Sequence, residues 1–390
     1  MNYILFDSFG RDSLLPFTFT RPVADIRVGI LTIREKWEFY LKSATSSLTQ
    51  QYLNPKFPIL KEKDNLLING SVFPTTRLVQ KIAELEPGHI LAKGEIIIAM
   101  RVEESQIDDF ASQEIDSTIE WEEEMVKLNE NWEIFSFNPT AIVEDFKLIT
   151  AGRKSQPLSK TNFVTGDPKL IFLEEGARSE FAFLNTTDGP IYIGKEAEIM
   201  EGSKVRGPFA LCEHAHLKMD AKIYGGTTVG PYSKVGGEVS NSVIFGYTNK
   251  GHDGFLGNSV LGEWCNLGAD TNTSNLKNTY DIVRLWSYDK ESFVSTGLQF
   301  CGLIMGDHSK SGINTMFNTG TVVGVSCNLY GAGFQRNFVP SFSWGSPSGM
   351  KSYNFAKAVQ VAEAVYKRRN MEFDQNEKDI FEFLYNLNAD

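Results

Sequence analysis

The sequence has few cysteines, no long apolar run and no excess of basic residues. Its 390 residues contain four cysteines without CxxC spacing, so we expect reduced, packed thiols and neither a metal site nor a disulfide framework. The sequence has 38 basic and 49 acidic residues, and the resulting net charge of −11 argues against nucleic acid or an anionic membrane as a bulk partner. The opening MNYILFDSFGRDS resembles neither a signal peptide nor a transmembrane segment, so we expect a cytoplasmic protein.

The sequence does contain a repeat with a period of six residues. Neither a helix, with its period of 3.6, nor a solvated strand, with its period of 2, gives this spacing. A small residue mostly follows four places after each aliphatic one. Hexads are typical of a parallel β-helix, so we predict one left-handed solenoid over residues 166–345. The first run of aliphatic positions comprises Ile193, Ile199, Val205, Leu211, Leu217, Ile223, Val229 and Val235.

The repeat is interrupted twice. Asn241 stands where the next aliphatic residue belongs, and the stretch NKGHDGFLGNSVLGEWCNLGADTNTSN at 249–275 spans the point, Leu261, where the rhythm resumes. We interpret residues 241–256, and the longer segment 272–300, as insertions on one face of the solenoid, where binding surfaces commonly form. Prisms of this kind often trimerise with sites between subunits, so we expect a homotrimer.

Segments of a different kind flank the solenoid. Residues 1–153 alternate apolar runs such as YILFD, NLLING and EIIIAMR with a helical pattern, which predicts an α/β sheet domain. The basic, proline-containing segment 154–165 is typical of a linker. Residues 346–390 predict a helical tail with a second helix at 376–387, which we interpret as a cap over the open end of the prism. The helical pattern in the first domain consists of Ile26, Ile30, Ile33, Trp37 and Leu41.

An α/β domain followed by a hexapeptide solenoid resembles the bifunctional N-acetylglucosamine-1-phosphate uridyltransferase and glucosamine-1-phosphate acetyltransferase. The resemblance covers nearly the whole chain and is carried by TRPVADIRVGILTIREKW, NTTDGPIYIG and NKGHDGFLGNSVLGEWCNLGADTN. It implies a transferase of sugar-nucleotide biosynthesis. The N-terminal nucleotidyltransferase domain would join a sugar 1-phosphate to UTP, and whether this step uses Mg²⁺ stays open. The acyltransferase β-helix would acetylate an amino-sugar phosphate with acetyl-CoA as co-substrate.

The acetyltransferase motif of that family fits the interrupted stretch. The family has a histidine in a Lys- and Gly-containing turn, then Leu-Gly, an asparagine in NIGAG and a later asparagine. His252, Asn266 and Asn275 stand at these positions, with offsets of 14 and 23 residues. The resemblance makes His252 the general base, and imidazole, with a pKa of about 6.5, can accept the proton of an attacking amine. Without the motif, a histidine in a Gly-rich loop is a solvated surface residue, as we expect for His214, His216 and His308.

Several positions of the acetyltransferase motif differ from the family. Phe255 stands where the family has a tyrosine, the turn SNSV lacks a phosphate-binding lysine, and Tyr224 occupies the place of a phosphate-binding arginine. We consider Lys250, Lys222 and Arg284 as substitutes that bind substrate or acetyl-CoA. The identity of the sugar and of the acyl donor stays open.

The N-terminal domain differs further. FDSFGRDSLLPFTFTRPV has no Gly-rich phosphate loop, and Ser71 replaces a metal-binding aspartate, for which Asp7 could compensate. Arg27 and Arg34 are expected on one face of the predicted helix, where they either grip phosphates together or form a solvated charged face. A non-catalytic, trimeric sugar-nucleotide-binding scaffold is the alternative to an active enzyme. Our candidate nucleotide ligands are Arg11, Arg21, Arg27, Arg34 and Lys36.

Overall fold

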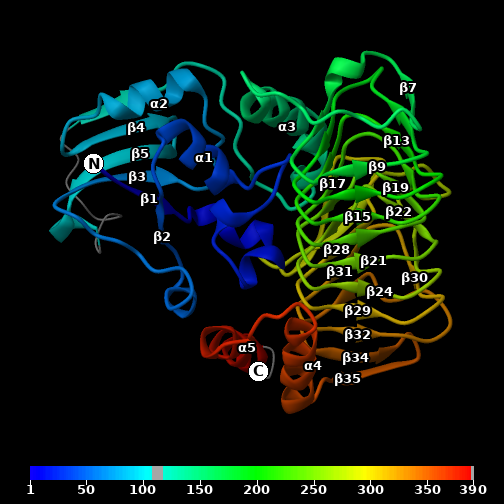
Figure 1. The fold of residues 1–390 in the computed structure, drawn as a ribbon. Helices are drawn as coiled ribbons and strands as arrows, with labels where there is room; N and C mark the ends of the chain where they lie inside the picture. The colour runs from blue at the N-terminus through cyan, green and yellow to red at the C-terminus, as the bar shows by residue number, and fades with distance from the viewer. Residues whose placement is uncertain (108–116, 388–390) are drawn as a thin grey trace. The chain divides into compact units, whose positions relative to one another are not determined.

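The computed structural model describes residues 1–107 and 117–387. The chain divides into two compact units, each described here by itself (Figure 1). No helix in the described part of the chain is long and apolar enough to cross a membrane. The first unit comprises Met1–Leu14, Thr20–Ile26 and Leu31–Glu130, and the second comprises Leu15–Phe19, Arg27–Ile30 and Asn131–Asp390.

The first unit is built on a six-stranded mixed sheet with the strand order β2-β1-β3-β5-β4-β6. Strand β1 pairs in parallel with β2 and β3, whereas β5 runs antiparallel to β3 and β4. The three apolar runs of the sequence form β1, β3 and β5, as predicted. The strands are β1 (Asn2–Phe6), β2 (Ser46–Leu48), β3 (Asp64–Asn69), β4 (His89–Lys93), β5 (Ile96–Glu103) and β6 (Ser117–Glu120), and the helices are α1 (Ile33–Leu41) and α2 (Thr76–Ala83).

Helix α1 is shorter than the sequence pattern predicted. It begins at Ile33, where Thr32 and Glu35 form a capping box: the Glu35 N–H donates to Thr32 Oγ1 (3.1 Å) and the Thr32 N–H donates to the Glu35 carboxylate (2.6 Å). Arg27 precedes this cap and belongs to the second unit. The expectation that Arg27 and Arg34 share a helix face is therefore wrong.

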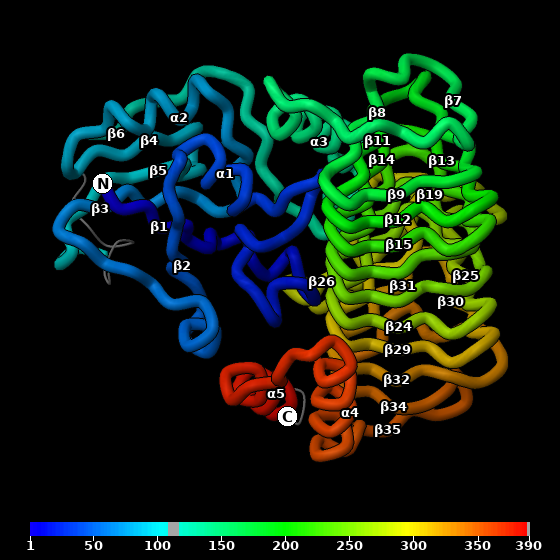
Figure 2. Tube along the Cα trace, viewed as in Figure 1, coloured from blue at the N-terminus to red at the C-terminus, as the bar shows by residue number. Residues whose placement is uncertain are grey.

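The second unit is a left-handed parallel β-helix whose coils supply strands to three faces (Figures 1 and 2). Face A contains β7 (Phe163–Thr165), β10 (Phe183–Asn185), β13 (Lys204–Arg206), β16 (Lys222–Ile223), β19 (Glu238–Ser240) and β22 (Phe255–Gly257), followed by the pair β25 (Asn272–Thr273) and β30 (Met316–Phe317). Face B contains β8 (Ile171–Leu173), β11 (Ile191–Ile193), β14 (Phe209–Leu211), β17 (Thr227–Val229), β20 (Val243–Ile244), β23 (Val260–Leu261), β28 (Leu303–Met305), β31 (Thr321–Val323) and β33 (Phe338–Val339). Face C contains β9 (Arg178–Ser179), β12 (Glu198–Ile199), β15 (His216–Leu217), β18 (Lys234–Val235), β21 (Asn249–Lys250), β24 (Asn266–Leu267), β29 (Lys310–Ser311), β32 (Asn328–Leu329), β34 (Ser343–Ser346) and the antiparallel β35 (Gly349–Ser352).

The aliphatic residues of the hexads form the interior of the β-helix, as predicted. Ile193, Leu211 and Val229 of face B stack in register and are fully buried. Burial of a side chain of this size stabilises the fold by roughly 1.5–3 kcal/mol, so the repeated stacking supplies most of the driving force. Cys265 and Cys327 are buried among them as free thiols.

The first interruption of the rhythm is a shortened corner and not an insertion. Val239 faces the interior and is fully buried, although it follows Val235 by only four positions and not six. The corner between them, Gly236–Gly237, is two residues shorter than the neighbouring ones. Asn241 is a corner residue with a φ of 42°. The expected insertion at 241–256 is therefore wrong.

The second interruption is a true insertion. After β25 the chain leaves the coil and forms an antiparallel hairpin, β26 (Arg284–Ser287) with β27 (Ser292–Ser295), before it returns at β28. Trp286 of this hairpin stacks on Phe338 with ring centroids 4.4 Å apart. The hairpin is thus attached to the β-helix.

The remaining helices of the second unit pack on the outside of the β-helix. Tyr366 of α4 stacks on Trp264 at a centroid distance of 4.0 Å, and Phe381 of α5 meets Phe342 edge-on at 5.5 Å. Because these contacts reach several coils, the tail lies along the flank, and the expectation of a cap over the open end is wrong. These helices are α3 (Glu133–Thr150), α4 (Phe355–Lys367) and α5 (Gln375–Leu387), and the 3₁₀ helices of the chain are η1 (Phe9–Leu14), η2 (Phe17–Phe19), η3 (Val23–Asp25), η4 (Gln51–Leu53), η5 (Glu104–Gln106) and η7 (Pro168–Leu170).

Candidate functional site

His252 lies at the corner where the chain passes from β21 on face C to β22 on face A, and it is exposed. The backbone of this corner is fixed by the neighbouring coils. The Asp270 N–H donates to the Asp253 carbonyl oxygen (3.0 Å), and the Glu238 N–H donates to the Gly254 carbonyl oxygen (3.3 Å). The imidazole therefore projects toward solvent from a loop that has little freedom to move.

Lys250 holds the same corner from inside. It occupies an inward position, in register with Val235 of the preceding coil, and is 2% exposed. Its ammonium group donates to the carbonyl oxygens of Gly236 (2.8 Å) and His252 (3.0 Å). Burial lowers the pKa of Lys250 to about 8, although the nearby Asp253 carboxylate acts to raise it. Lys250 thus presents its charge to two loop carbonyls and not to an external substrate.

Two glycines allow the coils to approach closely around His252. A Cβ at Gly254, which has a φ of +125°, would lie 2.2 Å from the Thr271 carbonyl oxygen. A Cβ at Gly237 would lie 2.9 Å from the Asp253 Cα. These glycines therefore serve contact between coils, because any larger residue would push the adjacent backbone away.

The two asparagines of the sequence motif lie on two different faces of the β-helix, and neither shares the corner of His252. Asn266 is on the outer surface of face C, where it accepts a hydrogen bond from the Asn249 amide (3.0 Å). Asn275 lies where the chain leaves face A, and its amide donates to the Asn258 side-chain oxygen (2.8 Å). Their roles in substrate binding stay predictions.

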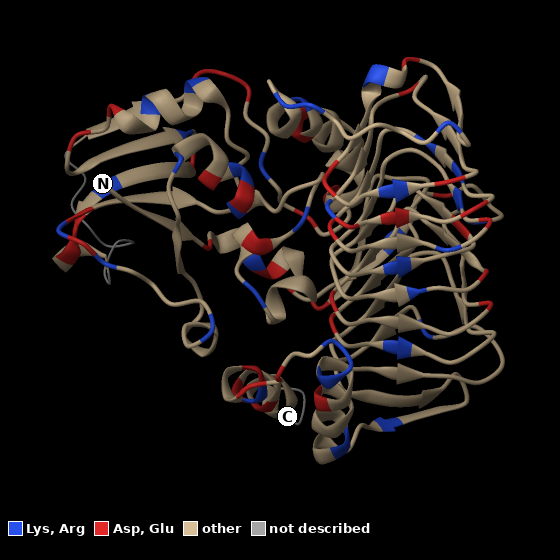
Figure 3. Ribbon diagram, in the orientation of Figure 1, with Lys and Arg blue, Asp and Glu red and all other residues tan. Residues whose placement is uncertain are grey.

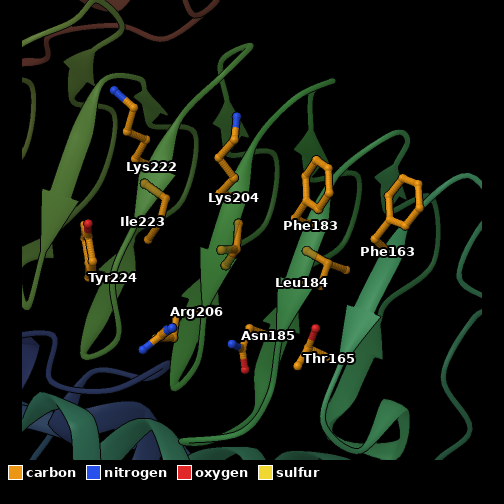
Figure 4. A pocket seen from close by; sticks show the side chains of 11 residues that line it. Phe163, Thr165, Phe183, Leu184, Asn185, Lys204, Arg206, Lys222, Ile223 and Tyr224 are labelled. Carbon is orange, nitrogen blue, oxygen red and sulfur yellow. The ribbon is translucent and has the colours of Figure 1, made fainter.

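Face A carries a shallow cavity of about 350 Å³ that combines cationic and aromatic side chains (Figure 4). Figure 4 shows Phe163, Phe183, Lys204 and Lys222 in one row, with the two phenylalanine rings stacked 5.0 Å apart. A second row runs parallel to the first and consists of Thr165, Asn185, Arg206 and Tyr224.

The face A cavity has one cation close to the His252 corner. Lys204 is paired with Asp220 (3.3 Å) and Arg206 with Asp188 (3.6 Å). Lys222 of β16 is the strand neighbour of Glu238 in β19. Glu238 is in turn the strand neighbour of Phe255 in β22, the third residue after His252. Lys222 is thus two strands away from the histidine corner on the same face.

Arg284, the other cation considered from the sequence, is on the inserted hairpin. It lines a cavity of about 720 Å³ together with Lys277, Asn318 and Phe334. Its guanidinium donates to the Phe293 carbonyl oxygen across the hairpin. Arg284 therefore belongs to a different cavity from Lys222.

The candidate nucleotide ligands predicted from the sequence are buried or half-buried and have partners inside the protein. Arg11 contacts Asp7 (3.3 Å) and the Tyr52 hydroxyl (2.9 Å), and Arg34 makes a bidentate pair with Asp25 (2.7 and 2.9 Å). The remaining three are also buried: Arg21 is 5% exposed, Lys36 is 4% exposed and lies over the Phe73 ring, and Arg27 in the second unit donates to the Ile30 carbonyl oxygen. Their role as phosphate ligands stays a prediction.

The residues present do not fit a Mg²⁺ site in the first unit. Burial raises the pKa of Asp7, and its carboxylate already accepts from the Val23 N–H (2.8 Å) and pairs with Arg11. The Ser71 hydroxyl donates to Asn69 (2.6 Å). Among the residues that the structure describes, no group of three His, Cys, Asp or Glu side chains is arranged to hold a metal ion. We therefore derive no step through a metal.

Comparisons with known proteins agree with the resemblance seen in the sequence. Residues 3–154, from β1 to just beyond α3, match a family model described as sugar nucleotidyl transferase. The chain is 37% identical over 90 residues to "Bifunctional protein GlmU" of Methanocaldococcus jannaschii, a match covering 23% of this chain and 21% of the relative. It is 28% identical over 144 residues to "Bifunctional sugar-1-phosphate nucleotidylyltransferase/acetyltransferase" of Sulfurisphaera tokodaii, covering 36% and 35%.

A solved structure was also found among the similar proteins. UDP-N-acetylglucosamine acyltransferase from Campylobacter jejuni is 14% identical, with a TM-score of 0.18, over 58% of this chain and 95% of that one. The chain spans about a fifth to a third of the length of the two curated relatives named above. The similarity therefore confirms a nucleotidyltransferase-like N-terminal part, whereas the activity of the whole protein is a matter for proposal.

Proposed function

We propose that the β-helix transfers an acyl group from a thioester such as acetyl-CoA to the amine of an amino-sugar phosphate, with His252 as general base. The observation that carries the proposal is the exposed imidazole on a fixed corner of face A. The similarity to the bifunctional sugar-1-phosphate nucleotidylyltransferase/acetyltransferase of Sulfurisphaera tokodaii supports the same chemistry.

The proposed step forms one bond and breaks one. The amine nitrogen attacks the thioester carbonyl carbon, the carbon–sulfur bond breaks, and the thiolate of coenzyme A leaves. The amine loses a proton, which the neutral imidazole of His252 accepts. General base catalysis of this kind contributes typically 10²- to 10⁴-fold to the rate.

The face A cavity is where we place the phosphate of the acceptor. Lys222 is exposed there, and Tyr224, the residue after β16, provides a hydroxyl. A lysine binds phosphate as a point charge without demanding a bidentate geometry. The acceptor would then span two strand spacings, about 10 Å, between Lys222 and the His252 corner.

The active form in this proposal is a cytoplasmic homotrimer. His252 shares its corner position with Met219 and Ile313 of other coils, which are 67% and 70% exposed. Exposed apolar side chains along one edge mark surfaces of association. A neighbouring copy on that edge would enclose the amine and the thioester beside His252.

The test is an acetyl-transfer assay with glucosamine 1-phosphate and other amino-sugar phosphates, using wild type, His252→Ala and His252→Gln. We expect acetyl-CoA-dependent product with wild type and a 10²- to 10⁴-fold loss in both variants, since an amide cannot accept the proton. His216→Ala is the matched control, because His216 lies on a regular coil and pairs with Glu198 (3.2 Å). Equal rates in wild type and His252→Ala would refute the proposed base.

For the first unit we propose uridylyl transfer, which the match to the sugar nucleotidyl transferase model supports. The alternative is a sugar-nucleotide-binding scaffold without activity, and the buried, internally paired arginines favour it. Release of pyrophosphate from UTP and N-acetylglucosamine 1-phosphate with added Mg²⁺ supports transfer. Binding without turnover supports the scaffold.

A further inference from the structure

Four cations surround one cavity on the flank of the β-helix: Lys234 and Lys310 on face C, and Arg368 and Arg369 at the C-terminal end of α4. Lys234, Asn249, Asn266 and Lys310 occupy successive outward positions of face C. At about 4.8 Å per strand, the two lysines stand roughly 14 Å apart, with two amides between them. Figure 3 shows Lys and Arg on several strands of the solenoid and on α4.

The C-terminal end of α4 closes this cavity. Arg368 and Arg369 follow the helix directly, and both line the cavity together with Val365. Arg369 is fixed by a hydrogen bond from its guanidinium to the Tyr232 carbonyl oxygen (2.9 Å). The enclosed volume is about 440 Å³, which falls within the usual range for small-molecule sites.

The walls of the cavity are rigid. Trp264 is sandwiched between Tyr247 (4.2 Å) and Tyr366 (4.0 Å), so both of its faces are occupied. The ring stack fixes the distance between the β-helix and α4. A ligand would therefore meet charged and amide groups and not an open aromatic face.

The positive charge of the cavity is not neutralised by the protein. Within the described residues, no carboxylate lies at salt-bridge distance from Lys234, Lys310, Arg368 or Arg369, whereas Lys204, Arg101 and Arg153 elsewhere on the surface are all paired. Burial and then repulsion by Arg369 lower the pKa of Lys234, and burial lowers that of Lys310 to about 8. In a chain of net charge −11, this cavity is a local concentration of positive charge.

Free hydrogen-bond donors accompany the charge. The Asn266 side-chain oxygen accepts from Asn249, which leaves the Asn266 amide NH₂ with no partner among the described residues. Cations at the end of a helix are common because they interact with its dipole, and this alone accounts for Arg368. It does not account for Lys234 and Lys310, which come from coils far apart in the sequence and converge on the same cavity.

We propose that this cavity binds a small molecule bearing a phosphate or pyrophosphate group. Lys234, Lys310 and Arg368 would neutralise the phosphate oxygens, and the Asn266 amide would donate to an attached polar group. Charge-assisted bonds to phosphate are the strong ones, and four cations suit more than a single negative charge. His252, the proposed general base, does not line this cavity, whereas Asn266 of the same sequence motif does.

The test is calorimetric titration of the full-length chain with inorganic pyrophosphate, UDP and coenzyme A. We expect at least one of them to bind, and the Lys234→Gln/Arg368→Gln double variant to bind it at least tenfold more weakly. The matched control is Lys357→Gln/Lys367→Gln, which removes two charges from exposed positions of α4 that do not line the cavity. The control should stay within twofold of wild type, and the ligand whose affinity the Lys234→Gln/Arg368→Gln variant weakens most identifies the source of the phosphate.

Folding of the variants is checked by thermal unfolding without ligand. Since Lys234 and Arg368 repel each other, their removal should leave the melting temperature unchanged or higher. The proposal is overturned if none of the three ligands binds or if the Lys234→Gln/Arg368→Gln variant keeps wild-type affinity, which would place binding elsewhere in the chain. It is also overturned if the two double variants lose affinity equally, which would show a general charge effect. Because the readout is binding, this result is independent of acetyl-transfer activity.

Discussion

The Lys250 ammonium donates to the His252 carbonyl oxygen at 3.0 Å, from inside the β-helix. A charged side chain thus stands at an inward position where the preceding coil has Val235, directly beneath the proposed general base. A buried ammonium is costly unless hydrogen bonds compensate it, and here two carbonyl oxygens do so. Such a group in the core is difficult to explain by stability alone, which motivates the first two predictions.

The Lys250→Met variant should be more stable than wild type at neutral pH, by roughly 1 to 3 kcal/mol. The pKa of Lys250 is about 8 in the folded chain against 10.5 for the free group, so the unfolded chain binds the proton more strongly. Stability of the wild type therefore rises with pH between about 8 and 10.5. Urea denaturation at pH 7 and pH 10 should show the advantage of the variant at pH 7 and its disappearance at pH 10.

The same Lys250→Met variant should be slower in acetyl transfer, because the loop that carries His252 loses its internal anchor. We expect a loss of roughly 10-fold or more in kcat, of the order that misplaced catalytic groups produce. A changed pH–rate profile would show that the lysine acts through His252. Val235→Met, a substitution in the adjacent coil at an apolar inward position, is the control. Unchanged kcat and pH profile in Lys250→Met would mean that the hydrogen bond has no role in catalysis.

The solenoid could be predicted from the sequence because its interior is periodic. Val229 and Leu211 occur at fixed spacing, and this spacing alone specifies the coil. The interior residue that follows Val235 is Val239 and not Asn241, because a shortened corner breaks the six-residue register just as an inserted loop would. The pair Gly236–Gly237 was the available signal, since consecutive glycines permit a tighter corner than the neighbouring hexads have.

The candidate site was predicted less completely than the fold. The motif predicted His252 as the general base, and the structure shows that this residue is exposed. The inward position of Lys250 follows from the shortened corner at Gly236–Gly237, which the six-residue spacing did not predict. The cavity between face C and α4 could not be predicted from a sequence motif. Its cations Lys234, Lys310 and Arg368 belong to separate segments that only the folded β-helix and its tail bring together. His308, expected at the surface, is 5% exposed and lies edge-on to Phe381 (4.9 Å), because the tail covers it.

The Arg34→Ala variant should destabilise the first unit, by about 2–4 kcal/mol. Arg34 is bonded to both oxygens of Asp25 and to Thr45 and Ser47, so its removal leaves a largely buried carboxylate without its partner. Arg34→Lys should cost less but remain destabilising, because lysine cannot form the bidentate pair. Thermal unfolding measures the effect. If nucleotide affinity falls while stability does not, Arg34 is a ligand and not a structural residue.

The chain should form a homotrimer, with a mass of about three times 43.7 kDa by light scattering. The apolar side chains at the edge of face A, among them Met219 and Ile313, are 67% and 70% exposed, and association would bury them. Met219→Glu/Ile313→Glu should therefore shift the mass toward 43.7 kDa, because carboxylates resist burial in an apolar contact. Met371→Glu, at a 41% exposed position beyond α4, is the control and should remain trimeric. If the site lies between subunits, the double variant also loses acetyl transfer while His252 is intact. A wild-type chain that scatters as a monomer at working concentration would contradict both the trimer and the shared site.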